Sequence, residues 1–593
     1  MLQIPQPELG LNFSFIAPQQ CALKNLEQWL FDEGFRFEQA VFLPTDNTGP
    51  KDQFFETNDK KPGVKEPDFK KSDFMTTQKH TNEMQFLRLW RGFFQQLLLE
   101  VGLPFFALPR LHVSHAKEPN TFLVAVFLPG LDYFPSKLGE TINLSMQAFT
   151  MMNNTPYSLQ AYQQLGNWIM QHIYAPLRHE TQAGLSTIHT LKEAYKRKIP
   201  FMHLGASVYQ FGYGREQRIL SKSATDQDSH IGVRQSENKF TSAQRLKAAG
   251  LPAPNHFLVQ TPEQALQAAK QLGRPVVIKP HNLNRGEGVF IDLKTDNAII
   301  EAFETVKKLS QVALVEQQVD SISYRFFVYD NEVMYVSGGY PRSVCGDGIL
   351  TVEELLKLDA QAQLKKQPWH RYPAIGLDPE TLACLEQQDV SAKTILKHGV
   401  LVDIRKIISS QWGRSQTELD TSNIHPENCA LAVRAAALFN LTTAGVDLII
   451  KDLSKPWYQQ ACIINEVNYA PMLGASDVSI ASIPKLFDKM FPNNGRIPVE
   501  VFWGNDIKKT LKAAQKTQKT YQTKGIACYL TTQSETYGPD YKLHRLAVAD
   551  FNHRIKALLC DKNVAALMIV LPNQDALKTG FAIDLIDQVH EVV

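Results

Sequence analysis

The sequence lacks the features that mark exported and membrane-spanning chains. Its first residues, MLQIPQPELG, contain no basic segment followed by an apolar one, and no run of about 18 apolar residues occurs anywhere in the 593 residues. The seven cysteines are scattered without CxxC pairs, and their odd number argues against a disulfide framework. We therefore expect a cytoplasmic protein without a membrane partner.

The sequence also lacks an excess of charge of either sign. Lysine and arginine total 62 and aspartate and glutamate total 60, which gives a net charge of +2. Because the bulk charge does not indicate a polyanion partner, we expect no nucleic-acid partner. Isolated histidines such as His80 and His112 have no Cys, Asp or Glu neighbours at metal-ligand spacing. A chain of this length is too long to fold around one hydrophobic core, so about three to four domains are expected.

A strand followed by a glycine-rich loop is the strongest motif. GRPVVIKPHNLNRGEGVFIDL, residues 273–293, has the pattern of an apolar strand that carries Lys279 and then opens into the loop 284–288. A strand lysine beside bare backbone N–H groups places positive charge within reach of polyphosphate oxygens. Such a loop alone is equally typical of an ordinary turn. The segments that follow are VALVEQQVD, a strand that ends on Glu316, and SYRFFVYDNEVMYVSGG, a hairpin that turns at residues 330–331.

Two further strands carry oxygen ligands. GVDLII contains Asp447, and IINEVNYAP contains Glu466 and Asn468. Residues two apart project to the same side of a strand, so Glu466 and Asn468 can share one cation. Hard oxygen ligands from neighbouring strands are typical of Mg²⁺ that is bound together with nucleotide phosphates. Solvent-facing acids on a hairpin are the alternative for this pair of strands.

In this order the motifs resemble the ATP-grasp ligases, and among them the cyanophycin synthetases. The resemblance runs from about residue 185 to residue 491 through SHIGVRQSENKFTSAQRLKAAGLPAPNHFLV, RPVVIKPHNLNRGEGV, VEQQVDSISYRFFV, GDGILTVEEL, NIHPENCALAVRAAALFNLTTAGVDLIIKDLSKP and INEVNYAP. It implies a fold in which two α/β lobes grip ATP. It also implies a reaction in which a carboxylate is phosphorylated to an acyl phosphate that an amine then attacks.

The resemblance implies three kinds of role for the matching residues. Two lysines, the glycine-rich lid and the hinge after the third strand would contact ATP, two arginines would act in catalysis, and three oxygen ligands would hold Mg²⁺. The residues are Lys239, Lys279, Asn284, Arg285, Gly286, Gly288, Glu316 and Val319 for ATP, Arg325 and Arg405 for catalysis, and Asp447, Glu466 and Asn468 for the metal.

Two segments depart from the family pattern. The substrate loop IRKIISSQWGRSQTELD, residues 404–420, keeps Arg405 but has Arg414 at a glycine position, which favours an anionic or differently shaped acceptor. RIPVEVFWGNDIKKT, from residue 496, keeps the strand, loop and helix layout of a P-loop but has Ile507 where a glycine precedes the lysine. We therefore expect residues 493–593 to form a truncated, degenerate Mur-ligase-like domain without a working nucleotide site.

Together the motifs predict an α/β protein of three parts. These are an α+β domain over residues 1–160, similar to the N-domain of cyanophycin synthetases, an ATP-grasp ligase domain over 161–492, and a small P-loop-like α/β domain over 493–593. The predicted function is an ATP- and Mg²⁺-dependent ligase that adds an amino acid, with aspartate favoured by the resemblance, to an amino acid or short peptide. The alternative is a catalytically silent nucleotide-binding scaffold or regulator of a complete synthetase. The resemblance also suggests a homo-dimer or homo-tetramer.

Overall fold

The computed structural model divides the chain into two compact units. The first consists of residues 1–220 and 487–593, and the second of residues 221–486. The structure describes residues 2–3, 8–16, 22–32, 35, 82–115, 121–129, 135–181, 184–281, 283, 287–319, 321–339, 341–406, 416–418, 423–548, 550–574 and 582–593. Among these residues no helix has the length and apolar character required to cross a bilayer.

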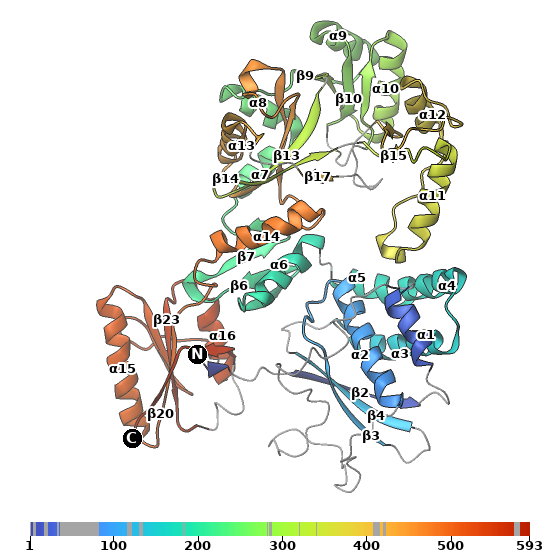
Figure 1. Ribbon diagram of the computed structural model, residues 1–593. Helices are drawn as coiled ribbons and strands as arrows, with labels where there is room; N and C mark the ends of the chain where they lie inside the picture. The colour runs from blue at the N-terminus through green and yellow to red at the C-terminus, as the bar shows by residue number, and fades with distance from the viewer. Residues whose placement is uncertain are drawn as a thin grey trace. The chain divides into compact units, whose positions relative to one another are not determined.

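The N-terminal part of the first unit is an antiparallel sheet with helices beside it (Figure 1). Apolar residues that recur three and four apart in EMQFLRLWRGFFQQLLLE lie on one helix, α2, and TFLVAVFLP forms strand β4. Helices α2 and α3 pack through buried aromatic rings, because Phe86 and Phe93 both contact Phe149. The elements are β2 (Glu8–Ile16), α1 (Leu23–Glu27), α2 (Asn82–Glu100), β3 (Arg110–His115), β4 (Thr121–Pro129), α3 (Leu138–Asn154), α4 (Leu159–Ile169), α5 (Ala175–Thr181) and α6 (Leu185–Lys196).

The C-terminal part of the first unit is a mainly parallel sheet covered on both faces. The strand order is β22-β21-β23-β20-β25, and all residues of β23 and nearly all residues of β20 are buried. One set of alternate residues packs under α16 and the other under α15, as doubly covered parallel strands require. The elements are β20 (Val499–Trp503), α15 (Ile507–Thr523), β21 (Cys528–Thr531), β22 (Thr536–Tyr537), α16 (Phe551–Cys560), β23 (Ala566–Leu571) and β25 (Gln588–Glu591).

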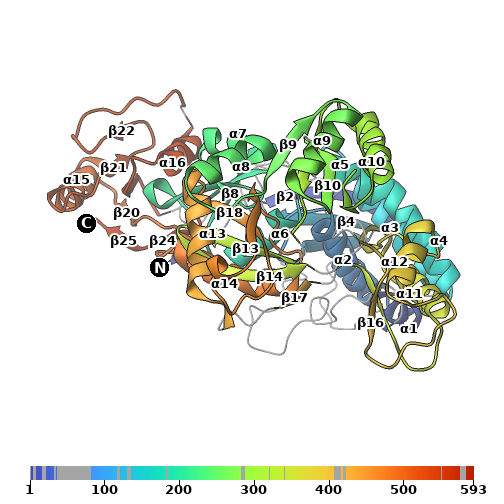
Figure 2. The same ribbon diagram turned by 90° about the horizontal axis from the view of Figure 1, so that it is seen from above.

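The second unit contains two antiparallel sheets that carry the predicted motifs. The first has the strand order β11-β10-β12-β9, and α9 and α10 lie side by side against it (Figures 1 and 2). Side-chain caps start both helices, because Thr261 and Thr295 accept hydrogen bonds from the first turns. The elements are β9 (His256–Val259), α9 (Pro262–Leu272), β10 (Val276–Pro280), β11 (Phe290–Leu293), α10 (Asp296–Leu309) and β12 (Ala313–Gln317).

The second sheet of this unit has the order β17-β14-β13-β18-β19. The predicted hairpin is confirmed: β13 and β14 are joined at Asp330 and Asn331, whose φ values of 44° and 62° suit a two-residue turn. The elements are α7 (His230–Glu237), α8 (Lys239–Ala248), β13 (Ile322–Tyr329), β14 (Glu332–Gly339), β17 (Gln416–Glu418), α13 (Pro426–Leu438), β18 (Thr443–Ile450), β19 (Cys462–Tyr469) and α14 (Asp477–Met490).

A small subdomain lies in the second unit between β14 and α13. It has its own apolar core, to which Val344, Leu356, Leu385 and Ile404 contribute. Its elements are β15 (Ser343–Cys345), α11 (Val352–Leu364), α12 (Pro379–Gln387) and β16 (Leu401–Asp403).

Candidate nucleotide-binding site

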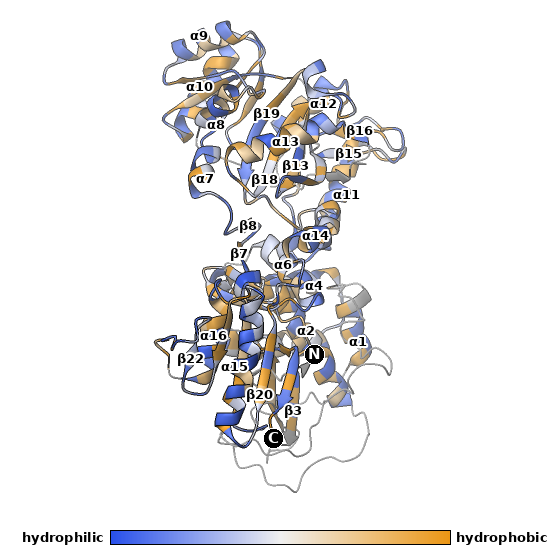
Figure 3. Ribbon diagram, turned by 90° about the vertical axis from the view of Figure 1, so that its left-hand side faces the viewer, coloured by the Kyte–Doolittle hydropathy of each residue, from blue (hydrophilic) through white to orange (hydrophobic). Residues whose placement is uncertain are grey.

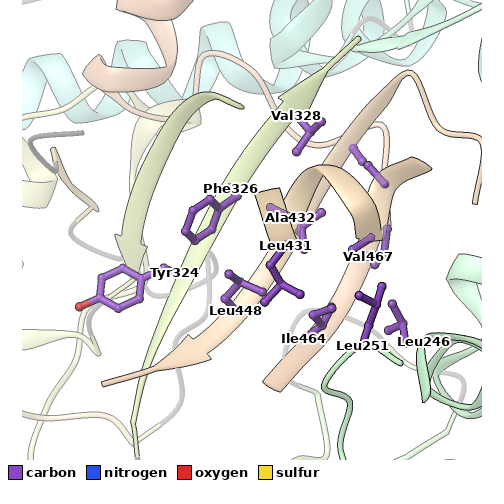
Figure 4. Packing of buried hydrophobic residues seen from close by; sticks show 14 of the residues in the cluster. Leu246, Leu251, Tyr324, Phe326, Val328, Leu431, Ala432, Leu448, Ile464 and Val467 are labelled. Atoms are coloured by element: carbon purple, nitrogen blue, oxygen red, sulfur yellow. The ribbon is translucent and has the colours of Figure 1, made fainter. Parts of the chain in front are cut away.

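Strand alternation separates the core of the second unit from its polar face. Phe326, Val446 and Val467 belong to the buried cluster between the sheet and α13 (Figure 4). Residues next to them in sequence therefore project from the opposite face. The cross-strand register places Arg325 opposite Asp447 and Asp447 opposite Glu466. The predicted acids and the predicted arginine thus share one face of the sheet.

Asp447 is the centre of a polar cluster on this face. Its two carboxylate oxygens accept hydrogen bonds from Arg325 Nε at 2.7 Å and from Arg325 Nη2 at 2.6 Å. Asn468 Nδ2 donates to Asp447 Oδ2 at 3.1 Å, so the amide oxygen of Asn468 points elsewhere. The carboxylate of Asp447 raises the pKa of Arg325 above its ordinary value. Such a bidentate pair fixes the guanidinium in one orientation.

Lys239 brings the start of α8 to the same cluster. Its Nζ lies 3.0 Å from Glu466 Oε1 and donates to the carbonyl oxygen of Leu283 at 3.0 Å. Asn238 caps α8 and so fixes the residue from which the lysine extends. Burial acts to raise the pKa of Glu466, but the ammonium groups of Lys239 and Lys279 outweigh it, so the pKa lies below its ordinary value. Glu466 is therefore a carboxylate at neutral pH.

The other sheet contributes a second ion pair. Lys279 Nζ lies 2.9 Å from Glu316 Oε2, and both side chains are more than 90% buried. The register places Glu316 opposite His256 on β9, so these three side chains share the face of the sheet that α9 and α10 leave open. Burial, together with the charges of Lys247 and Lys279, lowers the pKa of His256 from 6.5 to about 4. His256 is thus a neutral neighbour of a buried ion pair.

The predicted lid and hinge are described in part. Asn284, Arg285 and Gly286 lie outside the described residues. Gly288 has a φ of +68°, and a Cβ there would lie 2.8 Å from Leu309 Cδ1, so this turn requires glycine. Val319 is half-buried and lies two residues after the end of β12.

Arg405 occupies different surroundings from the other predicted residues. Its guanidinium is 3% exposed and contacts the start of α12, with Nη2 2.6 Å from Asp378 Oδ2 and Nη1 2.7 Å from Thr381 Oγ1. The Arg405 guanidinium contributes to a pKa of Asp378 below its ordinary value, against the opposing effect of burial. These contacts hold the segment that follows β16 to the start of α12. Arg414, farther along that loop, lies outside the described residues.

The structure thus connects seven of the predicted residues into one electrostatic group. Ion pairs and hydrogen bonds join Arg325, Asp447 and Asn468, and join Lys239 to Glu466 and Lys279 to Glu316. The charge of Lys279 also acts on Glu466. Sequence reasoning missed His256 and Asp378. The alternation of the NHFLV strand was a signal for His256, whereas nothing local in the sequence pairs Asp378 with an arginine 27 residues away.

Comparison with known proteins matches part of the second unit, which includes Lys239, Lys279, Glu316 and Arg325, to a known family. Residues 232–325 match the family model described as the ATP-grasp domain. The chain is 29% identical over 375 residues to cyanophycin synthetase from Nostoc sp. strain PCC 7120, which covers 62% of this chain and 41% of the relative. It is 27% identical over 426 residues to cyanophycin synthetase from Geminocystis herdmanii, covering 69% and 48%. The predicted ATP-grasp fold is therefore confirmed, and the chain is similar to the cyanophycin synthetases.

Glutathione-forming enzymes are also similar. The glutathione biosynthesis bifunctional protein of Mannheimia succiniciproducens is 30% identical over 274 residues, 44% of this chain and 36% of the relative. A crystal structure of a bifunctional glutathione synthetase from Pasteurella multocida aligns with a TM-score of 0.39 and 23% identity, covering 60% of this chain and 52% of the other. The chain spans less than half the length of the curated relatives it matches. The Mur-ligase-like interpretation of residues 493–593 and the three domain boundaries stay predictions.

Proposed function

We propose that this chain is an ATP- and Mg²⁺-dependent carboxylate–amine ligase. The observation that carries the proposal is the joining of Lys239, Lys279 and Arg325 to Asp447 and Glu466 within one unit that contains the ATP-grasp match. Three cations in a partly desolvated place suit the phosphates of ATP. Their acidic partners keep them oriented in the absence of the nucleotide.

Three side chains offer oxygen ligands that fit an Mg²⁺ ion bound to phosphate oxygens as well. Asp447, Glu466 and Asn468 offer carboxylate and amide oxygens, which are ligands that Mg²⁺ prefers. In the described part of the chain no three His, Cys, Asp or Glu side chains gather as a metal-binding group, so nucleotide oxygens and water would complete the coordination. The metal, when bound, would offset the charge on the phosphates.

The proposed reaction has two steps. A carboxylate oxygen of the first substrate attacks the γ-phosphorus of ATP, and the bond to ADP breaks to leave an acyl phosphate. The amine of the second substrate then attacks the acyl carbon, releases phosphate and loses a proton, which leaves an amide. Arg325 would steady the transferring phosphoryl group. An amino acid, with aspartate favoured, and an amino acid or short peptide are the proposed substrates, and a homo-dimer or homo-tetramer is the proposed assembly.

The test is ADP release by the full chain in the presence of Mg²⁺ and pairs of amino acids, with mass spectrometry of the product. The proposal requires ADP and an amide in equal amounts for at least one pair. ATP binding without amino-acid-dependent ADP release for any pair would overturn it. That result would favour the alternative, a silent nucleotide-binding scaffold.

A further inference from the structure

Helix α15 follows a loop that resembles a phosphate-binding loop but is filled by the protein itself. Asp506 Oδ1 accepts hydrogen bonds from the backbone N–H groups of Lys508 at 2.9 Å and Lys509 at 3.2 Å. A Cβ on Gly504 would lie 2.3 Å from the carbonyl oxygen of Val592, so the neighbouring strand packs directly on the loop. The first-turn N–H groups that would bind an anion are therefore already occupied by a carboxylate.

Helix α15 also carries a set of exposed lysines. The helix IKKTLKAAQKTQKTYQT contains no Asp or Glu, and its lysines are all exposed. None of their ammonium groups forms an ion pair or hydrogen bond with any residue that the structure describes. In Figure 3, α15 shows long hydrophilic stretches. The lysines are Lys508, Lys509, Lys512, Lys516 and Lys519.

The lysines form one face of the helix. At about 100° per residue, all five fall within an arc of about 100°. Thr510, Ala514 and Gln518 lie on the opposite side and are buried against the sheet. We call the five lysines the lysine face. The buried side holds the helix in place without help from the lysine face.

The lysine face does not stabilise the helix that carries it. Lys508 and Lys509 lie at the N-terminal end, where the helix dipole disfavours positive charge. Lys508, Lys512 and Lys516 follow one another at i, i+4 spacing, where like charges repel. A helix whose lysines form no ion pair with any residue that the structure describes gains most from an anionic partner.

The spacing of the lysine face matches an extended acidic chain. Lysines four residues apart are separated by about 6.0 Å along the helix axis. Side chains on one side of an extended peptide repeat at about 6.6 Å. The lysine face contains neither arginine nor an exposed aromatic ring, whereas single-stranded nucleic acids are held by aromatic stacking and arginine. Tyr521, the aromatic residue of α15, donates to buried Glu500 at 2.8 Å instead.

We propose that the lysine face of α15 is a docking surface for an acidic polypeptide segment in extended conformation. The partner presents carboxylates on alternate residues, and at least three of them meet successive lysines. The lysine face belongs to the first unit and the proposed nucleotide site to the second, and the proposal does not depend on ligase activity. Because the lysines are exposed, salt weakens the interaction strongly.

The experiment uses the full chain and a fluorescein-labelled peptide of ten aspartates, with binding followed by fluorescence anisotropy at low salt. The double variant Lys512→Glu/Lys516→Glu should bind about tenfold more weakly or worse, because two attractions become repulsions. The matched control is Lys393→Glu/Lys397→Glu, two exposed lysines at the same sequence spacing in the second unit, which should bind like the wild type.

Three results would overturn the proposal. They are absence of peptide binding by the wild type at low salt, an equal loss in the control variant, and tighter binding of a ten-nucleotide single-stranded DNA than of the peptide under the same conditions. Circular dichroism checks that both variants fold. Should Lys512→Glu/Lys516→Glu unfold, the milder Lys512→Gln/Lys516→Gln variant takes its place and should bind several-fold more weakly than the wild type.

Discussion

The polar face of the second unit and helix α15 both present lysines, but they surround them differently. Lys239 and Lys279 each lie within 3.0 Å of a carboxylate and are largely buried. The lysines of α15 are exposed. Asp506 is the acid nearest to them in sequence, and its carboxylate accepts hydrogen bonds from backbone N–H groups of the first turn rather than from a lysine ammonium group.

The difference follows from desolvation. A buried ammonium group without a partner is costly, so a site that excludes water must contain its own counter-charges. Those counter-charges also keep the cations oriented until a ligand arrives. An exposed lysine has no such requirement and can stay unpaired until a partner supplies the negative charge. The pairing of Lys239 and Lys279 is thus what a desolvated site requires, whereas the lysines of α15, which pair with no residue that the structure describes, are the basis of the proposed docking surface.

The largest expected effect is on ligase turnover, which should depend on a buried, paired lysine and not on an exposed lysine of α15. Lys279→Ala should lower ligase turnover by about a thousandfold, because a phosphate contact of the transition state is lost. Lys508→Ala should leave turnover within about twofold, since the first turn of α15 is filled by Asp506. The measurement is the ADP release rate at saturating substrates. Near-normal turnover of Lys279→Ala would show that the nucleotide site is assigned to the wrong lysine.

The next effect is the loss of protein stability when the ion pair between Arg325 and Asp447 is broken. Asp447→Ala leaves the Arg325 guanidinium without its bidentate partner and should cost about 2–3 kcal/mol in the free energy of unfolding. The matched control is Asp359→Ala. Asp359 pairs with Arg342 and is more exposed than Asp447, so its loss should cost under about 1 kcal/mol. Urea unfolding measures both. Equal losses would contradict the special position of the Asp447 pair.

A smaller effect is expected in the loop before α15. Gly504→Ala places a methyl group against the carbonyl oxygen of Val592 and Thr510 Oγ1, which should cost about 1–3 kcal/mol of stability without changing turnover. Gly376→Ala, where a Cβ meets nothing within 4 Å, should change stability by less than about 0.5 kcal/mol. Thermal unfolding of the two variants checks this. A stable Gly504→Ala protein that binds ATP at α15 would reverse the interpretation of the loop.

A further prediction is a pH dependence of stability from His256. Its pKa is about 4 in the folded chain and 6.5 as the ordinary value, so the unfolded chain binds more protons between these limits. Stability should therefore fall as the pH drops from 6.5 towards 4. His256→Gln should reduce that slope, whereas His230→Gln, at an exposed position at the start of α7, should leave it unchanged. Urea titrations at several pH values measure the slope, and identical slopes for all three proteins would contradict the assignment.

Much of the fold could be predicted from the sequence because the strongest patterns, strand alternation and turn residues, are local. Alternation on β19 predicted that Glu466 and Asn468 share a face, and the Asp330–Asn331 turn predicted the hairpin. Long-range pairing could not be predicted in this way. Lys239 meets Glu466 across 227 residues of sequence, and only the folded register brings them together. The surroundings of Arg405 were unpredictable for the same reason.

The position of β18 within its sheet has a consequence for backbone motion. It lies between β13 and β19, pairs with β13 along its whole length and with β19 from Ala444 to Ile450, and nearly all its residues are buried. Amide hydrogens of such a strand exchange with solvent only when the surrounding structure opens cooperatively. Deuterium should therefore enter the backbone of β18 among the last in the second unit.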